Sequence, residues 1–442
     1  MRLAVFTSKY PARVATFFER DMRALIEAGI DIDVFPIYPL DASMWDYSLD
    51  TLNEDVISRD KFHHLTFSDV LKTARPYPLR RVGTYLRDVA ATSSSAIRHG
   101  IGPLAKTTYC LSKAWTWAKD HGDDYDHVLA YWGNYAATSA YAFHRLIKRP
   151  IPFSIWLHAG ADLYDTPVYL KQKLLYADQI ITCCAFNRKY LAQHYADIFP
   201  SISGKINVCY HGLNFPDFPY NPRGRQPLTI IAVGRLSKEK GFSYLVRAAH
   251  LLIMQGTNVE LEFVGDGEEA AALKILAEQL NISDRVSFHG WLKFKEVQKA
   301  IGQATILVHP SNGLGDGLPN VIREAMAIGT PVIASDIAGI HEALDDGRCG
   351  LLVPPRDVEA LANAIKALLS NPEQRVTFAD RARKRAEEKF DMWQNGINLA
   401  SLLAATKRDR ACPNSLEESL RGRPVLPRED GRPRRDVPTV IS

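Results

Sequence analysis

Residues 228–264 read LTIIAVGRLSKEKGFSYLVRAAHLLIMQGTNVELEFV, and their pattern indicates the fold class. The stretch opens with the aliphatic run 228–233 and closes with a second such run, 259–264. Between them, residues 241–255 carry apolar side chains at the spacing of one helical face. Parallel strands need a long crossover connection, so two strands separated by a helix of this length are typical of a β-α-β unit. The sequence therefore predicts a parallel sheet covered by helices.

The same alternation continues on both sides of this unit. Downstream, it predicts helices at 268–280 and 320–328 and strands at 285–290, 305–310, 331–335 and 350–354. Upstream, it predicts a helix at 16–29 and strands at 2–6, 31–37, 127–132, 154–159, 179–184 and 206–210.

Residues 213–227 hold four prolines without apolar periodicity, which is typical of a linker. We therefore expect an α/β protein with two doubly wound parallel-sheet domains. The expected divisions are 1–212, the linker 213–227, 228–387, final helices at 388–406, and a basic, proline-rich tail at 407–442 that we expect to be disordered.

Composition limits the function classes. The chain has 442 residues, 46% of them apolar, which suits two or three ordinary globular domains. No apolar run reaches the ~18 residues of a membrane span, and the apolar start at 3–6 is too short for a signal peptide. The net charge of +4 does not favour nucleic acid as a partner. The six cysteines are dispersed and fit reduced thiols, so we expect a cytoplasmic protein.

The segment VGRLSKEKG, residues 233–241, joins the first quoted strand to its helix. Ligands of parallel sheets bind beyond the carboxyl ends of strands. There Gly234 allows close backbone approach, while Arg235 and Lys240 bring two positive charges. The free N–H groups of the following helix point the same way. This set favours a diphosphate ligand; the alternative is a solvated turn without a ligand.

A second cluster lies in the glycine-rich stretch 311–335. Asp316 stands among three glycines, Pro319 fits the first turn of a helix, and Glu324 lies about one turn inside it. A loop carboxylate and free helix N–H groups can hold sugar hydroxyls and a phosphate together. A carboxylate one turn further along can accept hydrogen bonds from a ribose diol. The alternative is a carboxylate that only caps the helix.

His158 ends the predicted strand 154–159, and Asp162 follows four residues later. A single histidine at such a position is often structural, but its place at a strand's carboxyl end matches the other two clusters. Asp31 and Asp33 form a D-x-D pair within a predicted strand. We interpret this pair as a solvated strand edge and not as a metal site.

Taken in chain order, these motifs resemble those of the retaining nucleotide-sugar glycosyltransferases of family four. The likeness covers about residues 1–40 and 127–405, and includes YPARVATFFERD at 10–21 and VCYHGLNFPDF at 208–218. It implies the GT-B fold, in which two Rossmann-like domains face a central cleft. The N-terminal domain would bind the acceptor and the C-terminal domain the donor, with the helices after residue 388 crossing back to the N-terminal domain.

The resemblance also implies residue roles. Arg235 and Lys240 match the pair that binds the donor diphosphate, and Glu324 matches the acid on the ribose. Asp316 matches a residue that contacts the donor sugar and is usually Glu. His158 matches the histidine near the transferred sugar.

Other positions complete the implied site. Asp162 is the acid that follows this histidine, and Thr16 belongs to an acceptor-side loop whose sequence departs from the family pattern. The turn at Gly265 is expected near the nucleobase. The loop over the donor corresponds to Gly317, Leu318 and Pro319.

By the same resemblance we expect a hexosyltransferase of exopolysaccharide biosynthesis that retains anomeric configuration. The acceptor would attack on the face from which the phosphate leaves, and that phosphate would take the proton. We expect no metal or cofactor, because two cations and a helix N-terminus can compensate the leaving diphosphate.

The expected partners are a nucleotide-sugar donor and a glycan or lipid-linked acceptor. Residues 71–113 are basic and contain aromatic side chains, which suggests contact with an anionic membrane surface; a solvated helical insertion is equally consistent. Two other functions stay open, a sugar-nucleotide epimerase of the same fold and a nucleotide-sugar-binding scaffold without catalysis. An epimerase would act on the donor alone, and a scaffold would bind it without turnover.

Overall fold

The computed structural model describes residues 1–12, 16–44, 57–66, 68–69, 79–165 and 168–408. The chain divides into a compact unit, Met1–Arg408, and a second unit, Asp409–Ser442. The second unit lies outside the described residues, and so does nearly all of the tail that we predicted to be disordered.

The first half of this unit contains a six-stranded parallel sheet in the order β2-β1-β3-β4-β5-β6. Four of these strands lie within ranges that the sequence predicted, and the other two extend one residue beyond the predicted ranges 2–6 and 154–159. The strands are β1 (Arg2–Thr7), β2 (Asp31–Pro36), β3 (His127–Ala130), β4 (Phe153–Leu157), β5 (Gln179–Thr182) and β6 (Ile206–Val208).

The second half contains another six-stranded parallel sheet, in the order β12-β11-β10-β7-β8-β9. The strands are β7 (Thr229–Val233), β8 (Glu260–Val264), β9 (Val286–Phe288), β10 (Ile306–His309), β11 (Val332–Ser335) and β12 (Leu351–Val353). The predicted α/β class with two doubly wound parallel sheets is confirmed. In each sheet the chain reverses its direction of strand addition, between β1 and β3 and between β7 and β10, and such points favour ligand binding.

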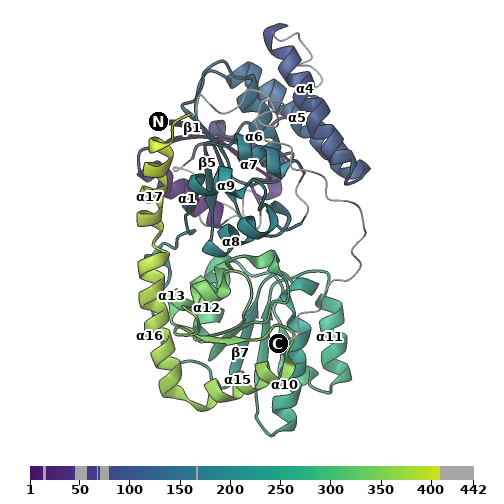
Figure 1. Cartoon of the computed structure of the whole chain (residues 1–442). Helices are drawn as coiled ribbons and strands as arrows, with labels where there is room; N and C mark the ends of the chain where they lie inside the picture. The colour runs from purple at the N-terminus through teal and green to yellow at the C-terminus, as the bar shows by residue number, and fades with distance from the viewer. Residues whose placement is uncertain (13–15, 45–56, 67, 70–78, 166–167, 409–442) are drawn as a thin grey trace, which may run out of the picture. The chain divides into compact units, whose positions relative to one another are not determined.

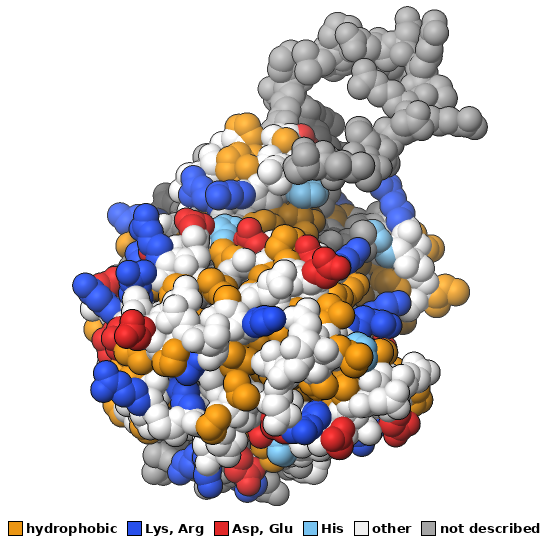
Figure 2. Space-filling view, turned by 90° about the horizontal axis from the view of Figure 1, so that it is seen from below, with side chains coloured by type: hydrophobic (Ala, Val, Ile, Leu, Met, Phe, Trp, Pro, Cys, Tyr) orange, Lys and Arg blue, Asp and Glu red, His pale blue; other side chains and the backbone are white. Residues whose placement is uncertain are grey.

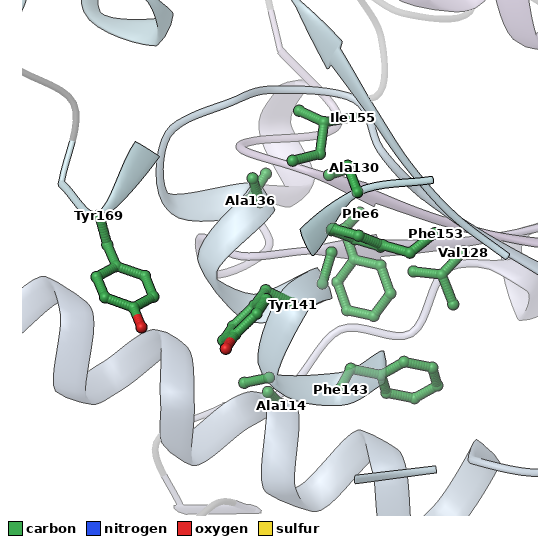
Figure 3. Packing of buried hydrophobic residues seen from close by; sticks show 14 of the residues in the cluster. Phe6, Ala114, Val128, Ala130, Ala136, Tyr141, Phe143, Phe153, Ile155 and Tyr169 are labelled. Atoms are coloured by element: carbon green, nitrogen blue, oxygen red, sulfur yellow. The ribbon is translucent and has the colours of Figure 1, made fainter. Parts of the chain in front are cut away.

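Helices cover both faces of the first sheet. Successive strand residues point to opposite faces, and those of each face belong to a separate buried cluster. One face packs against α1 (Thr16–Glu27) and α17 (Met392–Ala405). The other packs against α5 (Ile101–His121), α6 (Tyr135–Leu146) and α7 (Leu170–Tyr176). On this second face Phe6 of β1 contacts Phe143 of α6, with ring centroids 5.1 Å apart (Figure 3).

The second sheet is covered in the same way. One face packs against α10 (Phe242–Met254), α11 (Ala270–Gln279) and α15 (Val358–Ser370). The other packs against α12 (Phe294–Gln303), α13 (Asn320–Ile328) and α16 (Pro372–Lys389). The remaining α-helices in the described ranges are α4 (Leu79–Ile97), α8 (Ala185–His194), α9 (Phe199–Ile202) and α14 (Ile340–Ala343).

The C-terminal helices α16 and α17 follow one another along one side of the unit (Figure 1). Between them, the N–H of Leu213 donates to the carbonyl of Phe390 at 2.6 Å, and the N–H of Met392 donates back to Leu213 at 3.1 Å. Further along α17, Gly396 lies against Ala24 of α1, where an added Cβ would come within 2.4 Å of the alanine Cβ. The end of the described chain thus packs on the first sheet's helix layer.

One interpretation of the sequence needs correction at the D-x-D pair. Asp33 is not solvated: it is 2% exposed and bonds to Arg2 at 3.0 Å and to His63 at 3.3 Å. Burial raises the pKa of Asp33, but the hydrogen bond from His63 and the nearby Lys61 and Arg2 outweigh it, and the pKa falls to about 2. Asp31, its partner in the motif, is half exposed.

Within the basic stretch 71–113, residues 79–113 contain all of α4 and the first part of α5, a helical pair that projects from the first half (Figure 1). Tyr85 of this stretch packs on Trp115 just beyond it, with ring centroids 4.5 Å apart, and the nearby Trp117 is buried. Tyr77 lies outside the described residues.

Two surface properties bear on partners. Among the described helices, none combines the length and the apolar character that crossing a bilayer demands. On the face seen in Figure 2, Lys and Arg side chains are interspersed with Asp and Glu, in keeping with the net charge of +4.

Candidate active site

A cavity of about 460 Å³ lies where the strand ends of both sheets meet. Its walls come from residues that follow β3, β4 and β5 on one side and β7, β8 and β10 on the other. All but two of the predicted site residues line it: Thr16, His158, Gly234, Arg235, Lys240, Gly265, Asp316, Leu318, Pro319 and Glu324. The structure thus brings together side chains from distant parts of the chain.

Lys240 and Asp316 form an ion pair inside the cavity, although they are 76 positions apart. Asp316 also accepts hydrogen bonds from Nε2 of His309 at 2.8 Å and from the Ser311 hydroxyl at 2.7 Å. Burial opposes ionisation of Asp316, but Lys240 and His309 hold its pKa well below the usual range. Asp316 is therefore an anion held by three donors.

Arg235 is the second cation of the predicted diphosphate pair. Its guanidinium is 73% exposed and donates to Glu268 at 3.1 and 3.2 Å. An exposed pair of this kind is weak, so the guanidinium can exchange Glu268 for another anion at little cost.

Glu324 lies on α13, whose N-terminal residues Pro319, Asn320 and Val321 also line the cavity. The free N–H groups of this helix start therefore face the same space. The Glu324 carboxylate is 7% exposed and accepts a hydrogen bond from Arg20 of α1 at 3.2 Å. This contact ties the two halves of the unit together.

His158 follows β4, and its ring packs among aromatic groups at the wall of the cavity. The ring centroid lies 4.3 Å from that of Trp132 and 5.9 Å from that of Phe17. It stacks on His211 at 4.9 Å with an angle of 8° between the rings. Neither ring nitrogen of His158 has a hydrogen-bond partner among the described residues.

Asp162 is buried but does not line the cavity. Its carboxylate accepts hydrogen bonds from the backbone N–H groups of His158 and Asn134, both at 2.8 Å. It therefore fixes the two turns that follow β3 and β4. We predicted Asp162 for the acceptor side of the site, and its contacts make it an anchor of the backbone behind His158.

Two glycines allow the backbone to come close where the site needs it. Gly265 has a φ of +130°, and a Cβ there would lie 1.9 Å from the carbonyl oxygen of Gly234. Gly317 has a φ of +56°, and its Cβ would lie 2.6 Å from the Cβ of Ala159 in the other half. Gly317 thus shapes the cavity through its backbone, without lining it.

The sequence did not reveal three polar residues beside the cavity: Arg20, Asp21 and His211. All three are buried, and Nδ1 of His211 lies 2.6 Å from Oδ2 of Asp21. His211 had a detectable signal, because it directly follows the predicted strand 206–210. Arg20 and Asp21 lie on α1 at charged positions that would ordinarily face solvent, so their burial had no local signal.

Within the described ranges, no three His, Cys, Asp or Glu side chains gather as metal ligands.

Comparison with known proteins adds to this geometry. Residues 217–385 match the family described as Glycosyl transferases group 1. The chain is 27% identical over 414 residues to the amylovoran biosynthesis glycosyltransferase AmsK of Erwinia amylovora, which covers 91% of this chain and 99% of AmsK. It is 29% identical over 239 residues to a glycogen synthase of Mycobacterium tuberculosis, covering 54% of this chain and 56% of that protein.

Among solved structures, a sucrose-phosphate synthase from Thermosynechococcus elongatus is similar with a TM-score of 0.68 at 20% identity, covering 91% of this chain and 98% of that one. HepE from Anabaena, in complex with UDP, is similar with a TM-score of 0.64 at 17% identity, covering 91% and 99%. At these identities the likeness shows a shared fold.

Proposed function

We propose that this chain is a glycosyltransferase that transfers a hexose from a nucleotide-diphosphate sugar: it has the GT-B fold, and its residues 217–385 match the family described as Glycosyl transferases group 1. The proposed acceptor is a glycan or a lipid-linked glycan, and the anomeric configuration is retained. One observation carries this proposal: Arg235, Lys240, a helix start and two carboxylates of the second half share one cavity with His158 of the first half.

The donor is proposed to bind along the second sheet. Lys240, Arg235 and the free N–H groups of α13 suit a diphosphate, because they present several donors to its oxygens. Glu324 suits the ribose hydroxyls. The HepE structure of the same fold holds UDP, which supports a nucleotide ligand for this chain as well.

The Lys240–Asp316 pair suggests how the site changes when the donor arrives. A diphosphate near Lys240 offers the ammonium a second anion. Asp316 then keeps its hydrogen bonds from His309 and Ser311 and can accept others from sugar hydroxyls. We propose that the pair loosens without leaving either charge unpartnered.

The proposed reaction follows the family resemblance. The bond from the sugar's anomeric carbon to the diphosphate breaks, and a bond to the acceptor oxygen forms on the same face. The acceptor's proton passes to the departing phosphate, and His158 orients the sugar from the acceptor side. A well-placed donor in a water-poor site contributes about 3 kcal/mol, so the charges of Lys240, Arg235 and α13 can supply a large part of the catalysis. We propose that the enzyme needs no metal.

We further propose a role in the synthesis of a bacterial cell-surface polysaccharide, in the cytoplasm and at the membrane surface. The match to AmsK over 99% of that protein's length supports the first part. The tip of the α4–α5 pair supports the second: Ile97 and Ile101 are 59% and 84% exposed, and Arg98 and Lys106 flank them. Residues 89–119 include no Asp or Glu, which suits an anionic surface.

A flotation assay tests the membrane role. We expect the wild type to float with vesicles that contain anionic lipid and much less with neutral ones. The double variant Ile97→Asp, Ile101→Asp should lose this binding, whereas Met254→Asp, at a residue 73% exposed in the second half, should keep it. Equal flotation with both vesicle types would contradict the proposal.

The proposed donor is tested with a panel of UDP, GDP, ADP, CDP and TDP in thermal unfolding. A ligand at a hundred times its Kd stabilises the folded protein by about 2.7 kcal/mol, which gives a clear shift in Tm. A nucleotide-sugar with the selected base should then lose its sugar to an acceptor and only slowly to water. No shift with any nucleotide, or equal release of nucleotide without acceptor, would contradict the proposal.

A further inference from the structure

The side chain of Arg20 crosses from the first half of the unit into the second. It starts on α1, and its NH2 group donates to Oε1 of Glu324 on α13 at 3.2 Å. Both residues are buried, at 5% and 7% exposure. The ion pair therefore joins the proposed acceptor half to the carboxylate that we assign to the donor's ribose.

Two aromatic rings fix the orientation of the Arg20 guanidinium. Its central carbon lies 5.4 Å from the ring centroid of Phe218 and 5.2 Å from that of Phe294. Both rings belong to the second half, so the guanidinium sits in a slot that this half provides. Such cation–π contacts add attraction and limit the rotation of the planar group.

Arg323, the neighbour of Glu324 on α13, directs its hydrogen bonds elsewhere. Its NH1 group donates to the carbonyl of His211, and its NH2 group donates to Asn320. Among the described residues, Arg20 is therefore the group that hydrogen-bonds Glu324, and Oε2 of Glu324 has no such partner. Oε2 is thus the oxygen that can accept a hydrogen bond from a ligand.

We propose that Arg20 is a positioning residue for the donor: it holds one carboxylate oxygen of Glu324 and leaves the other turned to the ribose hydroxyls. The proposal rests on the proposed function, in which Glu324 contacts the ribose. A buried carboxylate is costly without an opposite charge nearby, and a single hydrogen bond from Arg20 to one oxygen leaves the other oxygen for the ligand. Arg20 itself need not touch the donor.

Because the contact crosses between the halves, it also links donor binding to the arrangement in which the two halves meet at Arg20 and Glu324. Loss of Arg20 should therefore weaken donor binding more than it slows the chemical step. The expected signature is a donor KM that rises by about tenfold or more, as for a lost hydrogen bond to a charged group, with a smaller change in kcat.

A double-mutant cycle tests the proposal. The variants are Arg20→Met, Glu324→Gln and the combination, and the readouts are the Kd of the nucleoside diphosphate selected by the panel, the donor KM and kcat. If Arg20 acts through Glu324, each single variant weakens nucleotide binding by about tenfold or more, and the combination is no weaker than Glu324→Gln alone. Losses that multiply in the combination would overturn the proposal.

Arg23→Met is the matched control. Arg23 lies one turn further along α1, and its guanidinium carbon is 5.6 Å from the Trp393 ring centroid on α17, away from Glu324. Its replacement should leave nucleotide binding unchanged. If Arg20→Met does not fold, Arg20→Lys decides instead: it keeps the charge without the planar contact, and binding should weaken by an intermediate factor.

The two proposals fail in different ways. A wild type that binds none of the nucleoside diphosphates would overturn the proposed function and this inference with it. A wild type that binds one of them, with an affinity that Arg20→Met or Arg20→Lys leaves unchanged, would overturn this inference alone.

Discussion

Nδ1 of His211 lies 2.6 Å from Oδ2 of Asp21, and both side chains are buried beside the cavity. Tyr131 donates to the same carboxylate oxygen at 2.5 Å. Burial lowers the pKa of His211, but the Asp21 carboxylate and the Cys183 thiol raise it more, so the net shift is upward. The pair joins α1 to the turn after β6 and anchors the helix that also carries Arg20.

Because the pKa of His211 is raised, the contribution of the His211–Asp21 pair to the free energy of unfolding depends on pH. In the unfolded chain His211 titrates near its ordinary value of 6.5, and in the folded protein above it. The stabilisation is therefore complete below this value and is lost as the pH rises through the folded pKa. Asp21→Asn removes the carboxylate, so we expect it to lower the free energy of unfolding by on the order of 1 kcal/mol more at about pH 6 than at about pH 9.

Urea unfolding at both pH values checks this expectation. Tyr131→Phe is the control, because it removes the other hydrogen bond to Asp21, and burial keeps the pKa of Tyr131 well above its usual range. Its cost should be the same at both pH values. An equal cost of Asp21→Asn at the two values would contradict the assignment of a charged His211.

The strand and helix order was predictable because each element repeats a local pattern. The run at 228–233 and the helical period at 241–255 need no distant partner to be recognised, and the structure has β7 and α10 there. The site was predictable in part for a related reason: parallel strands place their carboxyl ends together, so residues after several strands share one edge.

What the sequence could not provide was the pairing of these residues. Lys240 and Asp316 were each predicted as site residues, yet their ion pair depends on how β7 and β10 lie side by side. Arg20 appears as an ordinary charge on an amphipathic helix until the other half buries it. The position of Asp162 four residues after His158 suggested that it lies on the acceptor side of the site. In the structure its carboxylate accepts hydrogen bonds from two backbone N–H groups and holds the backbone in place.

Lys240→Ala should lower the rate of sugar transfer by about tenfold or more, because the ammonium is proposed to stabilise charge on the leaving diphosphate. Lys238→Ala is a close control: the residue stands two positions earlier, is exposed and does not line the cavity. Initial rates with saturating acceptor compare the two variants. Full activity in Lys240→Ala, or an equal loss in Lys238→Ala, would show that the Lys240 ammonium does not stabilise the leaving diphosphate.

Removal of divalent metal should leave transfer within about twofold of the untreated rate, since Lys240, Arg235 and the start of α13 are proposed to compensate the diphosphate charge. The measurement is the transfer rate after dialysis against EDTA, with and without added Mg²⁺ or Mn²⁺. A rate abolished by EDTA and restored by either ion would mean that the metal, and not these groups, carries the compensation.

Gly317→Ala should destabilise the protein, and its loop neighbour Gly315 provides the comparison. At Gly317 an alanine meets two penalties: a φ of +56°, which side chains other than glycine's adopt at a cost of about 1 kcal/mol, and a Cβ only 2.6 Å from that of Ala159. Neither the Cβ nor the backbone of Ala159 can rotate away, so the overlap must be relieved by movement between the two halves.

An alanine at Gly315 would meet nothing within 4 Å. We therefore expect Gly317→Ala to lower the free energy of unfolding by about 2 kcal/mol or more, from conformation and overlap together, and Gly315→Ala to change it by less than about 0.5 kcal/mol. Thermal or urea unfolding of the two variants decides the matter, and equal stabilities would mean that the halves do not approach each other this closely in solution.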